Sequence, residues 1–284
     1  MIHTARQLKD LVRNLSKGNS TQAQIIMRTY AMERFLERIA LSPYKDNFIL
    51  KGGMLVSAMV GLETRMTMDM DTTIRNLPLT AEHAEQMVSN IISIPLDDNM
   101  RFEVKSVGEI MNEAEYSGIR VQLDAYLETM RTPLKVDIST GDVITPHEIE
   151  FSYKLMFEDR HIPIKAYNLE TVLAEKIETV LSRGTENTRL RDFYDLYILN
   201  SLYTDSIDRI TLKQALHATA EKRGSQHLMP DSNLILHEIR SSSEMERLWH
   251  SYQKKYEYAA SIQWNEVMDA IEKLVHTAIS TDNE

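Results

Sequence analysis

The sequence contains no cysteine, which removes disulfides, cysteine nucleophiles, zinc–thiolate sites and iron–sulfur clusters from consideration. Glycine and proline are also scarce, with 9 and 7 in 284 residues, and this indicates a compact, helix-rich chain with few long loops. The most apolar run, residues 54–62, is too short to span a bilayer, and residues 1–18 lack the apolar core of a secretory signal. We therefore expect a cytoplasmic protein with no membrane partner.

Positive charge is in the minority, because 32 Lys and Arg stand against 42 Asp and Glu for a net charge of -10. This balance argues against a protein coated with basic charge for non-specific nucleic-acid binding. A local excess of positive charge exists between residues 160 and 191, which contain six basic residues and four glutamates. The segment suits phosphates or an RNA backbone, and the alternative is a solvated helix face with internal ion pairs.

Hydrophobic periodicity predicts an α+β fold. Apolar spacing of 3.6 indicates helices over residues 5–15 and 22–41, and in the second helix Glu33, Arg34, Glu37 and Arg38 lie opposite the apolar face. The pattern then predicts a strand at residues 48–50, a glycine pair, a helix over 54–61, a strand over 66–75 and a helix over 80–92. Alternation of period two around residues 102–104, 119–123 and 134–138 predicts three more strands in a mixed sheet.

From residue 168 the helical period persists to residue 279, with Asn168 placed as an N-cap. Further helices are predicted over residues 189–202, 212–222, 244–256 and 264–279. We therefore expect two domains, a mixed-sheet core with N-terminal helices over residues 1–166 and a helical domain over residues 167–284.

Two aspartates on the predicted strand 66–75 are the first candidates for chemistry. Asp69 and Asp71 are two residues apart and therefore face the same side, while Met68 and Met70 point into packing. Adjacent carboxylates repel each other unless a divalent cation or a cationic substrate neutralises them. A third carboxylate would complete a two-metal site for phosphoryl or nucleotidyl transfer, and the sequence offers Asp137 with Asp124 as its rival.

Two further features fit a phosphate site. Gly52 and Gly53 lie between a predicted strand and a helix, where backbone N–H groups can approach a phosphate. Lys176 lies along the apolar stripe of its helix, so its ammonium group must either reach solvent or meet an anion. Each feature alone is also typical of a tight turn or of solvated edge carboxylates; in this order they favour a nucleotide site.

Five segments carry these residues in order along the chain: Phe48-Ile49-Leu50-Lys51-Gly52-Gly53, Arg65-x-Thr67-x-Asp69-x-Asp71, Lys135-x-Asp137-Ile138, Leu173-Ala174-Glu175-Lys176 and Arg191-Asp192-Phe193-Tyr194-Asp195-Leu196-Tyr197. Together they resemble the motifs of the AbiEii/AbiGii toxin family, and the resemblance covers about residues 45–200. Members of that family have a nucleotidyltransferase fold and are the toxins of bacterial toxin–antitoxin or abortive-infection (phage-defence) systems.

The resemblance implies roles for individual residues. Asp69 and Asp71 would bind Mg²⁺ or Mn²⁺, with Asp137 as the third acidic metal ligand. Gly52 and Gly53 would hold the triphosphate, and Lys51, Arg65 and Thr67 would belong to the same nucleotide site. Lys176 would contact phosphate, and Asp192 would be the essential acid of the last motif, with Asp195 as the other candidate. One position departs from the pattern: Met54 follows Gly53 where a Ser or Thr is common, so the first hydroxyl is Ser57.

The implied activity is transfer of a nucleotide from a nucleoside triphosphate (NTP) to an RNA acceptor, the 3′ end of tRNA, which blocks translation. A cognate antitoxin protein would restrain the toxin. Two alternatives stay open from the sequence, namely a phosphotransferase acting on a protein hydroxyl and a non-catalytic toxin that acts by binding.

Overall fold

The computed structural model describes residues 1–61, 63–110 and 118–279. The chain divides into two compact units. The first, here called the sheet unit, comprises Met1–Leu62, Met66–Asp142 and Ile149–Ala166. The second, the helical unit, comprises Glu63–Arg65, Val143–Glu148 and Tyr167–Glu284.

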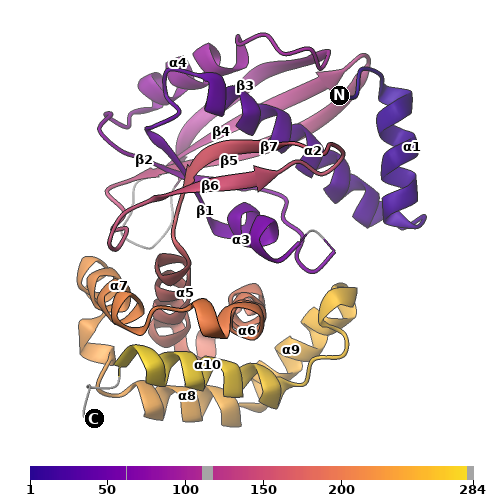
Figure 1. The fold of residues 1–284 in the computed structure, drawn as a ribbon. Helices are drawn as coiled ribbons and strands as arrows, with labels where there is room; N and C mark the ends of the chain where they lie inside the picture. The colour runs from indigo at the N-terminus through magenta and orange to yellow at the C-terminus, as the bar shows by residue number, and fades with distance from the viewer. Residues whose placement is uncertain (62, 111–117, 280–284) are drawn as a thin grey trace. The chain divides into compact units, whose positions relative to one another are not determined.

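The sheet unit is built on a mixed seven-stranded sheet with the strand order β3-β4-β5-β2-β1-β7-β6 (Figure 1). The strands are β1 (Phe48–Lys51), β2 (Met70–Ile74), β3 (Met100–Ile110), β4 (Gly118–Leu127), β5 (Met130–Thr140), β6 (Ile149–Lys154) and β7 (His161–Ala166). The helices are α1 (Ala5–Ser16), α2 (Ser20–Leu41), α3 (Gly52–Val60) and α4 (Ala81–Ile92). The pairs β2–β5 and β1–β7 are parallel and the other neighbours are antiparallel, which confirms the predicted mixed sheet and α+β class.

One face of the sheet is apolar and is covered by α2. Strand register aligns Val121, Val136 and Met70 on three adjacent strands, and all three are buried. Phe102 lies on the same face, where its ring centroid is 6.0 Å from that of Phe35 on α2. Because side chains alternate along a strand, the residues between these positions point to the opposite face.

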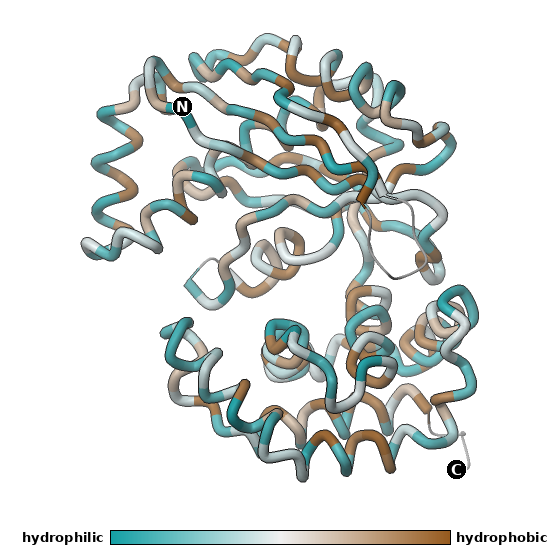
Figure 2. The backbone as a smooth tube through the Cα atoms, turned by 180° about the vertical axis from the view of Figure 1, so that it is seen from behind, coloured by the Kyte–Doolittle hydropathy of each residue, from teal (hydrophilic) through white to brown (hydrophobic). Residues whose placement is uncertain are grey.

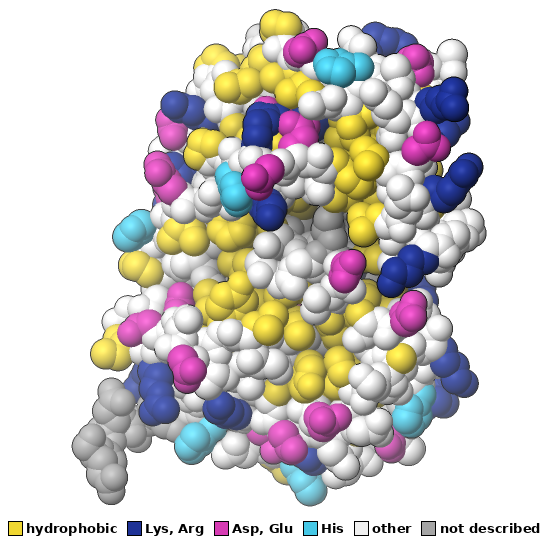
Figure 3. Space-filling view, turned by 45° about the vertical axis from the view of Figure 1, so that its right-hand side comes forward, with side chains coloured by type: hydrophobic (Ala, Val, Ile, Leu, Met, Phe, Trp, Pro, Cys, Tyr) yellow, Lys and Arg dark blue, Asp and Glu magenta, His cyan; other side chains and the backbone are white. Residues whose placement is uncertain are grey.

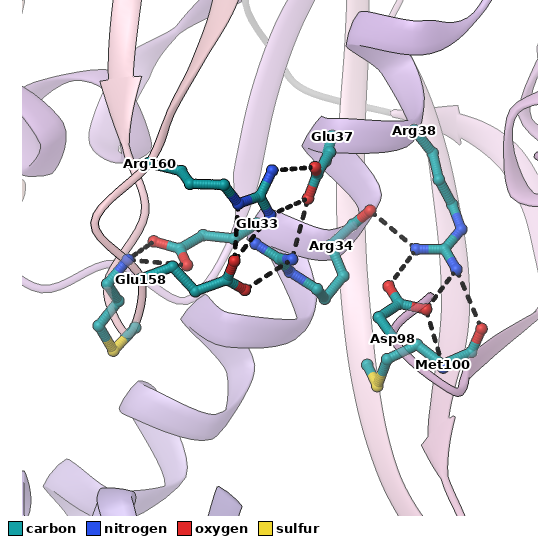
Figure 4. Close-up of polar contacts among 9 residues, drawn as sticks. Glu33, Arg34, Glu37, Arg38, Asp98, Met100, Glu158 and Arg160 are labelled. Carbon is teal, nitrogen blue, oxygen red and sulfur yellow. Dashed lines mark hydrogen bonds and ion pairs between the residues drawn. The ribbon is translucent and has the colours of Figure 1, made fainter. Parts of the chain in front are cut away.

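The charged side of α2, which lies opposite the apolar face as predicted, is buried rather than exposed to solvent. Glu33, Arg34, Glu37 and Arg38 are all enclosed (Figure 4). All residues from Thr29 to Ile39 are buried, and α2 contacts α1, α4, β5 and β7, so little of this part of the helix faces water. Periodicity marked the four residues as polar but could not show that acidic and basic partners from other segments would enclose them.

Three of these buried residues are in ion pairs, namely Arg34, Glu37 and Arg38. Arg38 donates to both Asp98 oxygens, at 2.7 and 2.9 Å, and to the Met100 carbonyl at 3.1 Å. Glu37 accepts from Arg160 at 2.9 Å (Figure 4). Burial raises the pKa of Glu33 to about 8, although the Met156 N–H donates to its carboxyl group. Removing one member of such a network leaves an uncompensated charge in the interior.

The strand predicted over residues 66–75 is shorter in the structure, because β2 begins at Met70. The backbone pairing explains the difference: within the segment 66–75, β1 pairs with residues 71–74 and β5 pairs with residues 70–74. Residues 66–69 therefore lack a ladder, and Met68 is 44% exposed rather than packed, whereas Met70 is buried as expected.

Three elements were missed by the sequence reading. Strands β6 and β7 form a hairpin at the edge of the sheet, where Pro163 interrupts the apolar pattern of β7. Helix α8 (Ser232–Ser241) is short and follows Pro230, so its period extends over few residues. Leu62, the last residue of the apolar run, lies outside the described residues.

The helical unit contains α5 (Leu169–Arg183), α6 (Leu190–Tyr203), α7 (Arg209–Lys222), α8, α9 (Ser243–Lys255) and α10 (Trp264–Ile279). Asn168 caps α5 as predicted, since its side chain accepts from Thr171 N–H at 2.8 Å. Hydrophilic and hydrophobic residues alternate along these helices (Figure 2), as expected for amphipathic helices that share a core. Trp249 is fully buried there and donates to the Ile262 carbonyl at 2.9 Å. Within the described part of the chain, no helix combines the length and apolarity that crossing a membrane requires.

Candidate active site

A row of four charged side chains crosses the sheet on the face opposite α2. Backbone register places Lys51 of β1 beside Asp71 of β2, Asp71 beside Asp137 of β5, and Asp137 beside Arg120 of β4. These positions alternate with the apolar positions that face α2, so all four point away from that helix. The order of charge is positive, negative, negative, positive. We call these four residues the charged row.

Asp71 lies against the start of α3. Gly52 has φ of +63°, and a Cβ atom there would lie 2.2 Å from Asp71 Oδ2 and 2.8 Å from Asp71 Cβ. The Gly53 N–H donates to the same oxygen over 3.4 Å. Glycine at position 52 is therefore required by the close approach of Asp71, which is a more specific reason than the flexibility of a phosphate loop.

The Asp71 carboxyl group is placed where its charge is disfavoured. Burial raises its pKa, and the neighbouring carboxylates of Asp137 and Asp69 add to the effect, while Lys51 and the Gly53 N–H oppose it. Like charges that are held together without a full counter-charge form a site for a cation.

Lys51 is held at its end of the charged row by Asp142. The two side chains form an ion pair, and Ser139 Oγ donates to Asp142 Oδ2 at 2.8 Å. The sequence reading missed Asp142. Its only signal is its position, because it follows Gly141 in the turn directly after β5.

At the β4 end of the charged row, Arg120 forms a bidentate ion pair with Asp137. The guanidinium donates from Nε at 2.8 Å and from Nη2 at 2.7 Å, one bond to each carboxylate oxygen. Arg120 was also missed, and its signal was the register of β4 against β5, which the sequence does not give. The other candidate acid, Asp124, lies four residues after Arg120 on β4, which places the two Cα atoms about 13 Å apart. It is buried and bonded to Arg131 at 2.8 Å, so it lies outside the charged row.

Asp69 and Thr67 precede β2. Asp69 lies in a bend and is half-buried, and Thr67 Oγ1 donates to its carbonyl oxygen at 3.2 Å. Among the described residues, no group of three His, Asp, Glu or Cys side chains is positioned to hold a metal ion. Mg²⁺ commonly takes one or two protein carboxylates and completes its shell with water and phosphate oxygens. Asp69 and Asp71 fit such a site, while each oxygen of Asp137 accepts a bond from Arg120.

The helical unit holds a second buried cluster. Lys176 Nζ donates to Asp192 Oδ1 at 2.9 Å and to Asp195 Oδ2 at 2.7 Å. Arg65 donates from Nε to Asp195 Oδ1 at 2.7 Å, and Arg189 Nε lies 2.8 Å from Asp192 Oδ2. The ammonium group on the apolar stripe of α5 thus meets an anion, and that anion is supplied by the chain itself. Arg65 belongs to this cluster, although it lies two residues before Thr67 in the motif.

Both aspartates of this cluster are kept ionised. Burial alone would raise the pKa of Asp195, but Arg65 and Lys176 overcome it and hold the pKa at about 2. The pKa of Asp192 is lowered against burial by Lys176 and Arg189. A general base works best with a pKa near the working pH, so neither carboxylate is a strong proton acceptor in this arrangement.

The first hydroxyl after the glycine pair does not face outward. Ser57 lies within α3 and is buried. Any phosphate near Gly52 and Gly53 would therefore meet backbone donors, in agreement with the departure from the usual pattern noted in the sequence.

Solved structures of other proteins resemble the chain only distantly. JHP933 from Helicobacter pylori has 14% identity over 90% of this chain and 93% of that one, with a TM-score of 0.49. An antigenic nucleotidyltransferase-like protein from Paracoccidioides brasiliensis has 17% identity over 82% and 93%, with a TM-score of 0.37. Similarity at this level carries no conclusion about the site. No curated protein matches significantly.

A family model does match, and over most of the chain. Residues 34–273 fit the family described as the nucleotidyl transferase AbiEii toxin of type IV toxin–antitoxin systems. The matched range includes the charged row and the buried cluster of the helical unit. The chain belongs to the AbiEii nucleotidyltransferase toxin family.

Proposed function

We propose that this protein is a metal-dependent nucleotidyltransferase toxin that transfers a nucleotide from an NTP to an RNA acceptor, the 3′ end of tRNA, and thereby blocks translation. The observation that carries the proposal is the pair of carboxylates at the centre of the charged row, Asp71 and Asp137, beside the glycine pair at the start of α3. Family membership supports the reaction class and implies a cognate antitoxin.

Asp69 and Asp71 would hold Mg²⁺ or Mn²⁺. The bound cation would neutralise the two carboxylates and stabilise the negative charge that develops on the phosphate oxygens. Asp137 as a third metal ligand stays a prediction, because Arg120 occupies it in this structure.

The remaining groups of the site would bind and orient the nucleotide. At the start of α3 the Gly52 N–H suits a phosphate oxygen, and the Gly53 N–H would exchange its long 3.4 Å contact with Asp71 Oδ2 for another phosphate oxygen. Lys51, fixed by Asp142, would add positive charge beside them. In the transfer, the acceptor hydroxyl oxygen bonds to the α-phosphorus, the bond to the leaving pyrophosphate breaks, and the hydroxyl proton passes to solvent water.

RNA binding would use exposed arginines of the helical unit. Of the six basic residues between 160 and 191, Arg183, Arg189 and Arg191 are exposed in that unit, whereas Lys176 is buried. On the face drawn in Figure 3, basic and acidic side chains are interspersed rather than gathered in one basic patch. We therefore expect a local RNA contact with modest salt dependence. Lys176 as a phosphate contact also stays a prediction, since two carboxylates already hold its ammonium group.

The test is label transfer. Purified protein is incubated with Mg²⁺, total tRNA and each of the four α-labelled NTPs, and the RNA is resolved on a denaturing gel. We expect label on tRNA with the wild type and none with Asp69→Asn, whose fold should persist because the change removes one of two repelling charges. Asp97→Asn is the matched control, since Asp97 is an aspartate of the same unit with a 93% exposed side chain.

Two results would contradict the proposal. Full transfer by Asp69→Asn would show that this carboxylate does not hold a required metal. Label that reaches a protein from the γ-phosphate, with none on RNA from the α-phosphate, would replace nucleotidyl transfer by phosphotransfer.

A further inference from the structure

Asp137 is the central acid that the sheet places next to Asp71, yet a guanidinium holds it where a cation would bind. Arg120 makes one bond to each of its oxygens, at 2.8 and 2.7 Å. Two parallel bonds of this kind are among the strongest that a carboxylate forms with a side chain. Each oxygen keeps a second lone pair, but the guanidinium charge beside it repels a divalent cation, so the cation gains Asp137 as a ligand at the cost of weakening or displacing the bonds to Arg120.

Arg120 is also placed so that it can leave. Its side chain is 41% exposed, in contrast to the enclosed Arg38 of α2. Solvent can therefore hydrate the guanidinium after it separates from Asp137. The strand backbone keeps Asp137 in register with Asp71 whether or not Arg120 is bound, because the ladder between β2 and β5 does not involve that side chain.

We propose that Arg120 is a positioning residue that competes with the divalent cation for Asp137, so that the protein without nucleotide binds the metal weakly. This inference rests on the proposed function. Its consequence is an order of binding: the cation arrives with the triphosphate, whose oxygens supply the ligands that outweigh the bond to Arg120. Free Mg²⁺ would then bind poorly on its own, although two carboxylates of the site lie side by side.

The test measures Mn²⁺ binding to the full chain without nucleotide, by the loss of the electron paramagnetic resonance signal of free Mn²⁺. Arg120→Met should tighten Mn²⁺ binding by about tenfold, because the strong bidentate bond no longer has to be broken. The matched control is Arg131→Met. Arg131 is an exposed arginine of the same sheet that is paired with a different aspartate, Asp124, and its loss should leave Mn²⁺ affinity unchanged.

A double-mutant cycle shows whether Arg120 acts through Asp137. In the Asp137→Asn background, Arg120→Met should tighten Mn²⁺ binding much less than it does in the wild type, because the contested ligand is gone and only the weaker coulombic effect of Arg120 on Asp69 and Asp71 remains. Arg120→Lys provides a second variant in case Arg120→Met fails to fold. It keeps the charge but cannot form the two-pronged contact, and its Mn²⁺ affinity should lie above that of the wild type.

The inference is overturned if Arg120→Met, or Arg120→Lys where the first variant does not fold, binds Mn²⁺ no more tightly than Arg131→Met. It is equally overturned if the tightening persists in full in the Asp137→Asn background. Label transfer separates this outcome from failure of the proposed function: a wild type that labels tRNA while Arg120→Met is unchanged in Mn²⁺ binding refutes the competition alone. A wild type that labels no RNA, with tighter Mn²⁺ binding by Arg120→Met, refutes the reaction and leaves the competition supported.

Discussion

Replacing Gly52 by alanine should damage the sheet unit more than an ordinary glycine substitution. The added Cβ would lie 2.2 Å from Asp71 Oδ2, and rotation of the carboxylate cannot relieve the overlap, since Asp71 Cβ is itself only 2.8 Å away. Backbone must therefore move, either at the start of α3 or in the central strand β2.

The expected cost has two parts. An alanine at φ of +63° costs about 1–2 kcal/mol in the left-handed region. Overpacking of a close contact adds about 1–3 kcal/mol. The sum is about 2–5 kcal/mol. Gly18→Ala is the control, because Gly18 lies in the same unit with φ of +85° and a Cβ atom added there would meet nothing within 4 Å, so only the first part applies.

Urea unfolding followed by far-UV circular dichroism measures both variants. Both tryptophans, Trp249 and Trp264, lie in the helical unit, so tryptophan fluorescence follows the unfolding of that unit. A change confined to the sheet unit should therefore alter the circular dichroism transition and leave the fluorescence transition unchanged. In an Asp71→Ala background the cost of Gly52→Ala should fall, because the 2.2 Å contact with the carboxylate oxygen is absent. The reasoning is refuted if Gly52→Ala loses no more stability than Gly18→Ala.

Two further predictions concern buried charges. The pKa of Glu33 is raised to about 8 in the folded protein, so the contribution of its neutral form to stability is complete below about pH 4.5 and is lost as the pH rises through 8. Glu33→Gln should therefore flatten the decline in the free energy of unfolding between these two pH values, as measured by urea unfolding at several pH values. An unchanged pH profile would contradict this assignment. Asp195→Asn should destabilise the helical unit by about 3–5 kcal/mol, because Arg65 and Lys176 would lose a buried partner. The control is Asp269→Asn at an exposed ion pair, which should cost less than about 1 kcal/mol. Tryptophan fluorescence reports both changes, and equal costs would rule out a structural role for the Asp195 pairs. Since the pKa of Asp195 is held at about 2, its contribution is present above the ordinary carboxyl range and should be lost only as the pH falls towards 2.

The candidate site could be predicted in its parts but not in its connections. Asp69, Asp71 and the glycine pair stand close in sequence, so their spacing and turn chemistry were enough to single them out, although Asp69 lies in the bend before β2 rather than on the predicted strand. The choice between Asp137 and Asp124 depended on the pairing of β5 with β2, which joins positions 66 residues apart. Arg120 carries no local signal, and Asp142 carries only its position after Gly141, because the importance of both comes from the side chains that they contact.

The sequence by itself determined the class of the fold and most helices, since periodicity and caps such as Asn168 are local properties of the chain. It also carries the match to the AbiEii family over residues 34–273. Only the tertiary structure decided which charges are paired: that the polar side of α2 is enclosed, that Lys176 meets Asp192 and Asp195, and that Arg120 grips Asp137. The physical reason is that the fate of a charged side chain depends on the segments packed around it, and burial forces it to find a partner that sequence spacing does not reveal.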